Sequence, residues 1–240
     1  MSHLDDILLS TVRIGTYDID RLLTSATGFF YEHRGRLFLV TANHVVHDAA
    51  SGHRPSRLVI DLHTDQKNLT SAAGLSIPLY IKGASIWRGA RDSGGDVDVA
   101  VIEIDRMAMP ENAMYRTFSE VNMPNEETVI KVGSTLLTVG YPLGFHDQLH
   151  LLPVVRQAGL ASAYGVRFQG LGYFLVDART HRGISGAPVV MRMCGDGDIE
   201  NYKLLGVHAS RLEAASRDPK LDEVLGLNAV WYADVLNMLT

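Results

Sequence analysis

The stretch that decides the fold is His181-Arg182-Gly183-Ile184-Ser185-Gly186-Ala187-Pro188, within a chain of 240 residues. Ser185 lies between two glycines and ahead of a proline and an apolar run. Glycines on both sides of a polar residue indicate a tight turn, because glycine adopts backbone conformations that other residues disfavour. A serine presented on such a turn is a candidate nucleophile.

Two motifs nearer the N-terminus supply a histidine and a carboxylate. His44 lies in Thr41-Ala42-Asn43-His44-Val45-Val46, and Asp98 directly precedes Val99-Ala100-Val101-Ile102. With Ser185 they give, in the order His, Asp, Ser, the three side chains of acyl-transfer catalysis. A neutral histidine accepts the serine proton and returns it to the leaving group, while a buried carboxylate fixes the histidine tautomer. These three residues are the candidate catalytic residues.

Other residues could serve as the catalytic histidine or as the catalytic aspartate. His47 and His53 lie close to His44 in the sequence, and Asp96 lies close to Asp98. We favour Asp98 because the apolar strand begins directly after it. The spacing His44-x-x-His47 could also suggest a metal pair, but no matched Cys or His cluster completes a site. We therefore expect neither a metal nor a cofactor.

The serine turn also offers backbone donors. The N–H groups of Gly183 and Ser185 could converge on the oxyanion that forms during acyl transfer. One such donor is worth about 2.7–4 kcal/mol in the transition state. The turn is not the nucleophile elbow of the α/β-hydrolases, which needs glycine two places after the serine, where Ala187 stands.

Short strand-like runs dominate the rest of the chain. The expected strands lie near residues 11–17, 28–32, 36–41, 58–62, 99–104, 135–140, 154–158, 173–177, 187–191 and 203–208. Residues 229–239 carry apolar side chains at helical spacing and predict a terminal helix. Many short strands with one late helix predict an all-β protein of two packed barrels.

These motifs resemble those of the trypsin-like (chymotrypsin-fold) serine peptidases, with the closest match in the bacterial HtrA-type and glutamyl endopeptidase branches. The resemblance covers nearly the whole chain. Besides the three catalytic motifs it includes Ser25-Ala26-Thr27-Gly28-Phe29-Phe30 and Thr138-Val139-Gly140-Tyr141-Pro142-Leu143-Gly144. It implies two six-stranded antiparallel β-barrels with the triad in the cleft between them, and the activity of a serine endopeptidase.

The polar stretch from Pro110 to Glu127 is a candidate linker between two lobes. We expect an N-terminal barrel lobe at residues 1–120, carrying the histidine and the aspartate. A C-terminal barrel lobe at residues 121–240 would carry the serine and the terminal helix.

One departure from the family pattern bears on activation. The usual Gly-Asp-Ser-Gly-Gly-Pro or Gly-Asn-Ser-Gly-Gly-Pro is here Gly-Ile-Ser-Gly-Ala-Pro. In trypsin the aspartate before the serine receives the new N-terminus after zymogen cleavage. Ile184 cannot make that ion pair, so activation by N-terminal insertion is not expected.

The resemblance also implies which residues recognise the P1 side chain, the one before the cleaved bond. Thr180 and His208 resemble the threonine and histidine that bind a P1 Glu or Gln in glutamyl endopeptidases and picornaviral cysteine proteases. A buried carboxylate or amide needs matched donors, which a hydroxyl and an imidazole provide. Arg179 stands where trypsin carries its pocket acid, so a P1 Lys or Arg is not expected. The alternative is that Thr180 and His208 are packing residues.

The residues that directly follow His208 are expected to pair with the substrate backbone, so that the substrate adds to the sheet as an extra β-strand. Its residues are Ala209, Ser210 and Arg211. The charge of Arg211 would add an attraction for Glu at P1.

Composition excludes several other classes of protein. The chain is 46% hydrophobic, which suffices for a sizeable core, and its formal charge of −5 is modest and unclustered, which disfavours a nucleic-acid or membrane partner. It has no apolar run of about 18 residues, no basic signal-like N-terminus and one cysteine, Cys194. We expect a cytoplasmic protein acting on peptide or protein substrates, with an oligomeric state that the sequence leaves open.

Two other functions fit the same scaffold. One is a catalytically silent protein-binding module that keeps the protease fold. Its sign would be a missing or misplaced triad residue, and none is missing from the sequence. The other is an esterase, because an acyl-enzyme route handles esters more readily than amides.

Overall fold

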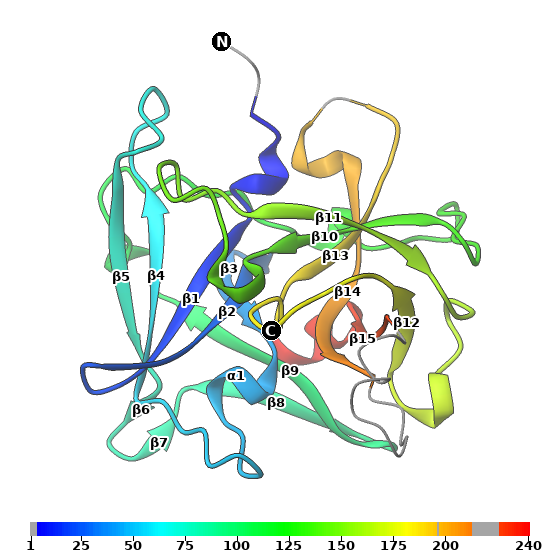
Figure 1. Ribbon diagram of the computed structural model, residues 1–240, viewed down its shortest axis with the longest axis horizontal. Coiled ribbons are helices and arrows are strands. Elements are labelled where there is room, and N and C mark those ends of the chain that lie inside the picture. Colours follow the sequence, from blue (N-terminus) through cyan, green and yellow to red (C-terminus); the bar gives the residue numbers. More distant parts are fainter. Residues whose placement is uncertain (1–3, 196, 213–225) are drawn as a thin grey trace.

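The computed structural model describes residues 4–195, 197–212 and 226–240, and most of its regular structure is β-strand (Figure 1). The N-terminal half forms a seven-stranded antiparallel sheet in the order β5-β4-β1-β2-β3-β9-β8. Its strands are β1 (Thr11–Asp18), β2 (Arg21–His33), β3 (Arg36–Thr41), β4 (Arg57–His63), β5 (Ala72–Pro78), β8 (Trp87–Asp92) and β9 (Gly95–Ile104). The short strands β6 (Tyr80–Ile81) and β7 (Ala84–Ser85) pair with each other.

The C-terminal half forms a closed six-stranded barrel in the order β10-β11-β12-β15-β14-β13. Its strands are β10 (Thr135–Gly140), β11 (Val154–Leu160), β12 (Tyr173–Asp177), β13 (Pro188–Arg192), β14 (Tyr202–Arg211) and β15 (Leu227–Tyr232). In the described ranges the α-helices are α1 (Asn43–Val46) and α3 (Val235–Leu239). The 3-10 helices are η1 (Asp6–Leu8), η2 (Arg106–Ala108), η3 (Glu120–Asn122), η4 (Pro142–Gly144), η5 (Phe168–Gly170) and η6 (Ile199–Asn201). None of the helices in the described ranges is long and apolar enough to cross a membrane.

The expectation of an all-β protein is confirmed, but that of two six-stranded barrels holds only for the C-terminal half. In the N-terminal half, β8 adds a seventh strand beside β9, and the sheet ends at β5 and β8, which are not paired with each other. The terminal helix is present but short. Residues 229–232, expected as helix, lie in β15 instead because this strand completes the barrel between β12 and β14.

A shared hydrophobic core joins the two halves. Phe29 and Val99 from the first sheet pack in one buried cluster with Val139 and Val207 from the barrel and with Leu236 of α3. Helix α3 contacts β8 and β9, so the last residues of the chain close over the first sheet. The expected lobes 1–120 and 121–240 therefore share their packing, and the boundary between them, which falls inside η3, stays a prediction.

The connection between the halves is fixed to the first sheet by Phe118. Its amide donates to the carbonyl of Phe30 at 2.9 Å, and its carbonyl accepts the amide of Glu32 at 2.7 Å. The Phe118 ring is fully buried and meets Phe29 edge to face, with ring centroids 5.5 Å apart. This segment is therefore paired with β2 through an isolated bridge between Tyr31 and Phe118.

Replacing Phe118 with Ala tests this attachment. The substitution leaves the backbone bonds but empties a buried site, so the free energy of unfolding should fall by about 3–5 kcal/mol. Chemical denaturation measures the change. Met107→Ala is the matched control, because the Met107 side chain is 91% exposed and its removal should cost less than about 0.5 kcal/mol. Equal stability of the two variants would show that Phe118 does not fix the connection.

Candidate active site

His44 is positioned by the end of a buried strand. The apolar residues of β3 are buried, and the chain turns at Ala42 into α1, whose Val45 and Val46 are also buried. These two valines hold the short helix against the sheet, which leaves the His44 side chain 39% exposed. A four-residue helix would not be stable alone. Its packing is what fixes the histidine.

Asp98 of β9 holds His44 through both of its carboxylate oxygens. The ring Nδ1 of His44 lies 2.8 Å from Oδ2, and the His44 backbone amide donates to Oδ1 at 2.9 Å. Because the carboxylate accepts a hydrogen bond from Nδ1, the neutral ring carries its proton on Nδ1. Its Nε2 atom is therefore left as a hydrogen-bond acceptor. This is the tautomer that can take a proton from a nucleophile.

The two carboxylates near His44 set its pKa. Burial lowers the pKa of His44, but the hydrogen bond and the charge of Asp98, together with the charge of Asp48, outweigh burial. The net pKa is raised above the ordinary value of 6.5. The imidazolium form is thus stabilised, as a group that must hold a proton briefly requires.

The competing residues lie elsewhere. Asp96 is 82% exposed and forms an ion pair with Arg91 at 3.3 Å. Nε2 of His53 donates to the Val45 carbonyl at 3.1 Å, and the His47 ring packs near that of Trp87. Within the described ranges no three His, Cys, Asp or Glu side chains are grouped as a metal site.

The peptide bond after Ser185 is held from both sides. The Ser185 carbonyl accepts the amide of Thr27 in β2 at 3.0 Å, and the Gly186 amide donates to the carbonyl of His208 in β14 at 2.8 Å. The C=O and N–H of a trans peptide point in opposite directions. Strands β2 and β14 therefore lie on opposite sides of Ser185.

The space around this turn requires glycine at position 186. Gly186 has φ +85°, and a Cβ added there would lie 2.2 Å from the Thr27 carbonyl oxygen and 2.3 Å from Oγ1 of Thr41. The glycine after the serine therefore lets the turn pack directly on β2 and β3.

The hydroxyl of Ser185 donates to the carbonyl of Ala209 at 3.1 Å. Among the described residues, no hydrogen bond joins it to His44. The structure thus brings His44 and Asp98 into contact and leaves Ser185 bonded to β14. Catalytic hydrogen bonds are often unformed without substrate, and a rotation about one side-chain torsion redirects a serine hydroxyl.

A second anchored peptide bond shapes the loop before Ser185. The Leu143 amide donates to the Arg182 carbonyl at 2.5 Å, so the amide of Gly183, in the same peptide, points the opposite way. The carbonyl of Gly183 accepts Oγ1–H of Thr27 at 2.7 Å. In the parts of the chain that the structure describes, the amides of Gly183 and Ser185 have no acceptor. These are the two amides expected to bind an oxyanion.

Thr180 and His208 meet at a residue that sequence analysis missed. Both are buried, and both donate to Oδ1 of Asn228, His208 from Nε2 at 3.3 Å. The Asn228 Nδ2 group donates to the carbonyls of Ala178 at 2.8 Å and Gly226 at 2.9 Å. Asn228 directly precedes the run 229–239 whose apolar spacing predicted a helix, so no sequence signal indicated its place here.

His208 is neutral at ordinary pH. Complete burial lowers its pKa to about 4, against a smaller raising effect of its hydrogen bond to Asn228. Its Nδ1 atom is buried and has no hydrogen-bond partner in the described residues. The ring is therefore a neutral donor through Nε2.

Among the described residues, no strand pairs with one edge at the end of β14. On one side it pairs with β15, through Ser210 with Ala229 and Arg211 with Asn228. On the other side its pairing with β13 ends at Val207. Ala209 is buried, while Ser210 and Arg211 are exposed. An extended chain could add to this edge.

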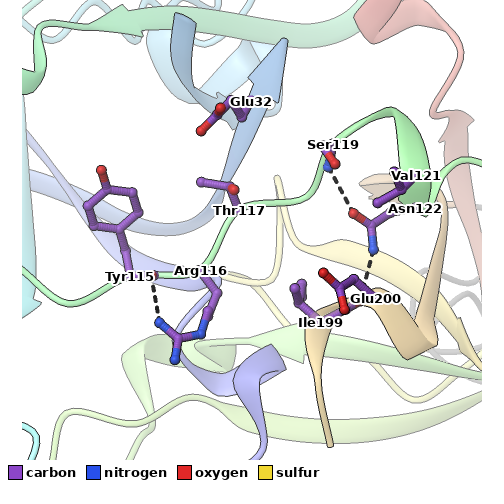
Figure 2. Close-up of a pocket in the computed structure, with 9 residues that line it drawn as sticks. All are labelled: Glu32, Tyr115, Arg116, Thr117, Ser119, Val121, Asn122, Ile199 and Glu200. Atoms are coloured by element: carbon purple, nitrogen blue, oxygen red, sulfur yellow. Dashed lines mark hydrogen bonds between the residues drawn. The ribbon is translucent and has the colours of Figure 1, made fainter. Parts of the chain in front are cut away.

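The pocket drawn in Figure 2 is a different feature, with a cavity of about 250 Å³ and none of the expected site residues in its lining. It lies between η3 and η6. Asn122 spans it by donating to the Ile199 carbonyl at 2.8 Å and accepting the Ser119 amide at 2.9 Å. These bonds indicate a structural role in holding η3 to η6.

Comparison with protein families matches residues 26–195 to the trypsin-like peptidase domain. The chain belongs to the trypsin-like peptidase family. The match includes His44, Asp98 and Ser185 and both anchored peptide bonds of this trypsin-like peptidase. No curated protein matches it by sequence.

Two solved structures share the fold of this trypsin-like peptidase. The serine endoprotease from Yersinia pestis is 15% identical, with a TM-score of 0.55 over 96% of this chain and 61% of that one. The Rv3671c protease from M. tuberculosis, in its active form, is 17% identical, with a TM-score of 0.51 over 97% of this chain and 80% of that one. The chain thus spans less than two thirds of the Yersinia protein.

Asp98→Asn tests the pairing with His44. The general base acts unprotonated, so kcat/KM of the wild type should rise with pH through a midpoint above 6.5, set by the raised pKa of His44. The amide removes the charge, so the midpoint should move to lower pH and the plateau should fall by about 10⁴. Steady-state kinetics across pH measures both.

Asp48→Asn is the control for this pH profile. It removes a charge that raises the pKa of His44 less than Asp98 does. The midpoint should therefore move only slightly to lower pH, and the plateau should stay unchanged. If Asp98→Asn moves neither the midpoint nor the plateau, Asp98 does not act on His44.

Gly183→Ala tests the anchored loop. Gly183 has φ +92°, and an added Cβ would lie 2.6 Å from the Tyr141 carbonyl oxygen and 3.0 Å from the Leu143 nitrogen. The Gly183 amide must then shift, so kcat should fall by about 10²–10³, the cost of one oxyanion donor. Retention of kcat within tenfold would contradict this role of Gly183.

Proposed function

We propose that this chain is a serine endopeptidase, with Ser185 as nucleophile, His44 as general base and Asp98 as the residue that orients it. The observation that carries the proposal is the double hydrogen bond of Asp98 to the ring and the backbone of His44, at 2.8 and 2.9 Å. Membership of the trypsin-like peptidase family supports it. Peptides or proteins would be the substrates.

The proposed reaction uses these groups in turn. The Ser185 hydroxyl turns from the Ala209 carbonyl to Nε2 of His44, gives up its proton and attacks the substrate carbonyl. The oxyanion that forms accepts hydrogen bonds from the backbone N–H groups of Gly183 and Ser185. His44 then protonates the leaving amine, and the acyl-enzyme remains on Ser185. A water molecule gives a proton to His44 and attacks the acyl carbon, and the bond from that carbon to Oγ of Ser185 breaks. His44 returns the proton to Oγ, which restores the serine and releases the acyl group as a carboxylic acid.

The substrate backbone would bind along the free edge of β14. The Ala209 carbonyl, which holds the serine hydroxyl in the free enzyme, would accept the N–H of the P1 residue. Ser210 and Arg211 would pair with the residues before P1. Binding of substrate thereby removes the acceptor that competes with His44 for the serine proton.

A preference for Glu or Gln at P1 is part of the proposal. Thr180 and His208 would supply the donors, and both already converge on one side-chain oxygen, that of Asn228. A P1 oxygen would take one of these donors from Asn228. Since His208 is neutral at ordinary pH, any advantage of Glu over Gln would come from the charge of Arg211.

Ser185→Ala tests the nucleophile. Loss of the hydroxyl should lower kcat on peptides by about 10⁴–10⁶. A fluorophosphonate probe should label the wild type and leave Ser185→Ala unlabelled. A fall in kcat of less than tenfold with the fold intact would contradict the assignment.

Fluorophosphonate labelling and hydrolysis assays also distinguish the endopeptidase from the two alternative functions. Absence of labelling in the wild type would favour a silent binding module. Hydrolysis of esters without hydrolysis of any peptide would favour an esterase.

A peptide library with varied P1 residues tests the specificity. Peptides with Glu or Gln should be cleaved at least about tenfold faster than those with Lys, Arg or large aromatic residues, since one matched hydrogen bond is worth about 1.4 kcal/mol. Thr180→Val keeps the shape of the side chain and removes its donor, so it should reduce the preference. Faster cleavage after basic or aromatic residues would refute the P1 assignment.

A further inference from the structure

The turn Tyr141–His146 lies directly beside the loop that precedes Ser185. The Leu143 amide bonds the Arg182 carbonyl at 2.5 Å, and a Cβ built on Gly183 would lie 3.4 Å from the Gly144 nitrogen. The backbone of Leu143 is therefore in contact with the oxyanion loop.

This turn lies on the leaving-group side of Ser185. In the proposed binding mode the acyl half of a substrate runs along β14. Strand β2 lies on the opposite side of Ser185, as the two hydrogen bonds of the Ser185–Gly186 peptide require. The turn packs on β2. The Tyr141 amide donates to Oγ1 of Thr27 at 3.1 Å, and a Cβ built on Gly144 would lie 3.9 Å from Oγ of Ser25. An extended substrate that passes Ser185 continues over this turn.

The turn exposes apolar side chains that the fold does not use. Leu143 is 71% exposed and Phe145 is 69% exposed. Leu143 also has φ +55°, a left-handed conformation that favours glycine or asparagine and disfavours leucine. Neither burial nor backbone conformation accounts for a leucine here. A contact between the Leu143 side chain and another molecule would account for a leucine at this position.

Hydrogen bonds fix the segment that carries these side chains. Nδ1 of His146 donates to the Gly144 carbonyl at 2.5 Å, and Nε2 of His63 in β4 donates to the His150 carbonyl at 2.5 Å. The Tyr141 hydroxyl donates to the Leu151 carbonyl at 3.1 Å. A surface held in this way is already formed before binding, which lowers the entropy lost on binding.

We propose that Leu143 and Phe145 form an apolar subsite that selects the first two residues after the cleaved bond, P1′ and P2′. The inference rests on the proposed endopeptidase function and adds the other half of its substrate specificity. Large apolar residues such as Leu, Ile, Met and Phe would be favoured at these positions. A closed apolar pocket discriminates by about 10–200-fold per group, so an open subsite should discriminate by about tenfold.

The test compares two kinds of substrate with the same acyl half. Fluorescence-quenched peptides vary P1′ and P2′ between Leu or Phe and Ser or Asp. A 4-nitrophenyl ester has no residues beyond the cleaved bond and cannot use the subsite. Both are measured with the wild type, Leu143→Asn, Phe145→Ser and the control Met107→Gln, which changes an exposed apolar side chain elsewhere. Asparagine tolerates the left-handed conformation, so Leu143→Asn should fold at least as well as the wild type.

The wild type should cleave peptides with apolar P1′ and P2′ about tenfold faster in kcat/KM than those with polar residues. Leu143→Asn and Phe145→Ser should each remove most of this difference, with a loss on peptides that exceeds any loss on the ester, while Met107→Gln should change neither activity. Wild-type cleavage without P1′ or P2′ preference would overturn the subsite and leave the proposed function standing. Equal loss on peptides and ester would also overturn it, because the turn would then act on the oxyanion loop alone. A wild type that hydrolyses neither substrate and takes no fluorophosphonate label would refute the endopeptidase function and the subsite with it.

Discussion

One buried threonine holds the nucleophile turn to the rest of the molecule. Thr27 of β2 donates its amide to the Ser185 carbonyl and its hydroxyl to the Gly183 carbonyl. The same hydroxyl accepts the Tyr141 amide, and the Thr27 carbonyl accepts Oγ1–H of Thr41. Thr27 is completely buried, so water cannot compete for these bonds. The position of Ser185 relative to β2, and so to His44 beyond β3, depends on this residue.

Much of this arrangement could be predicted because it depends on local pattern. The apolar runs around Val40 and Val101 lie in β3 and β9, where burial on both faces requires continuous apolar residues. The motifs around His44 and Asp98 pointed to two residues that the structure places in contact. The catalytic roles of these residues stay proposals until the variants are measured.

Other features could not be predicted, because they depend on pairing between distant segments. Strand β8 has little apolar alternation and is a strand because β9 pairs with it. Asn228 directly precedes the run with helical spacing, and pairing with strands β12 and β14 on its two sides places it in β15, where it binds Thr180 and His208. The left-handed conformation of Leu143 contradicts the preference of its own residue type, so only tertiary contacts can impose it.

The packing of α3 on the first sheet also bears on how the chain folds during synthesis. The cluster that buries Phe29 and Val99 is completed by Leu236, which lies more than two hundred positions after Phe29 and more than one hundred after Val99. Contacts so distant in sequence form late, since the intervening chain must be ordered first. While the ribosome is still making the barrel, one face of the first sheet stays open to water and to other nascent chains. Until α3 packs on it, the first sheet would be a target for chaperones that bind exposed apolar strands.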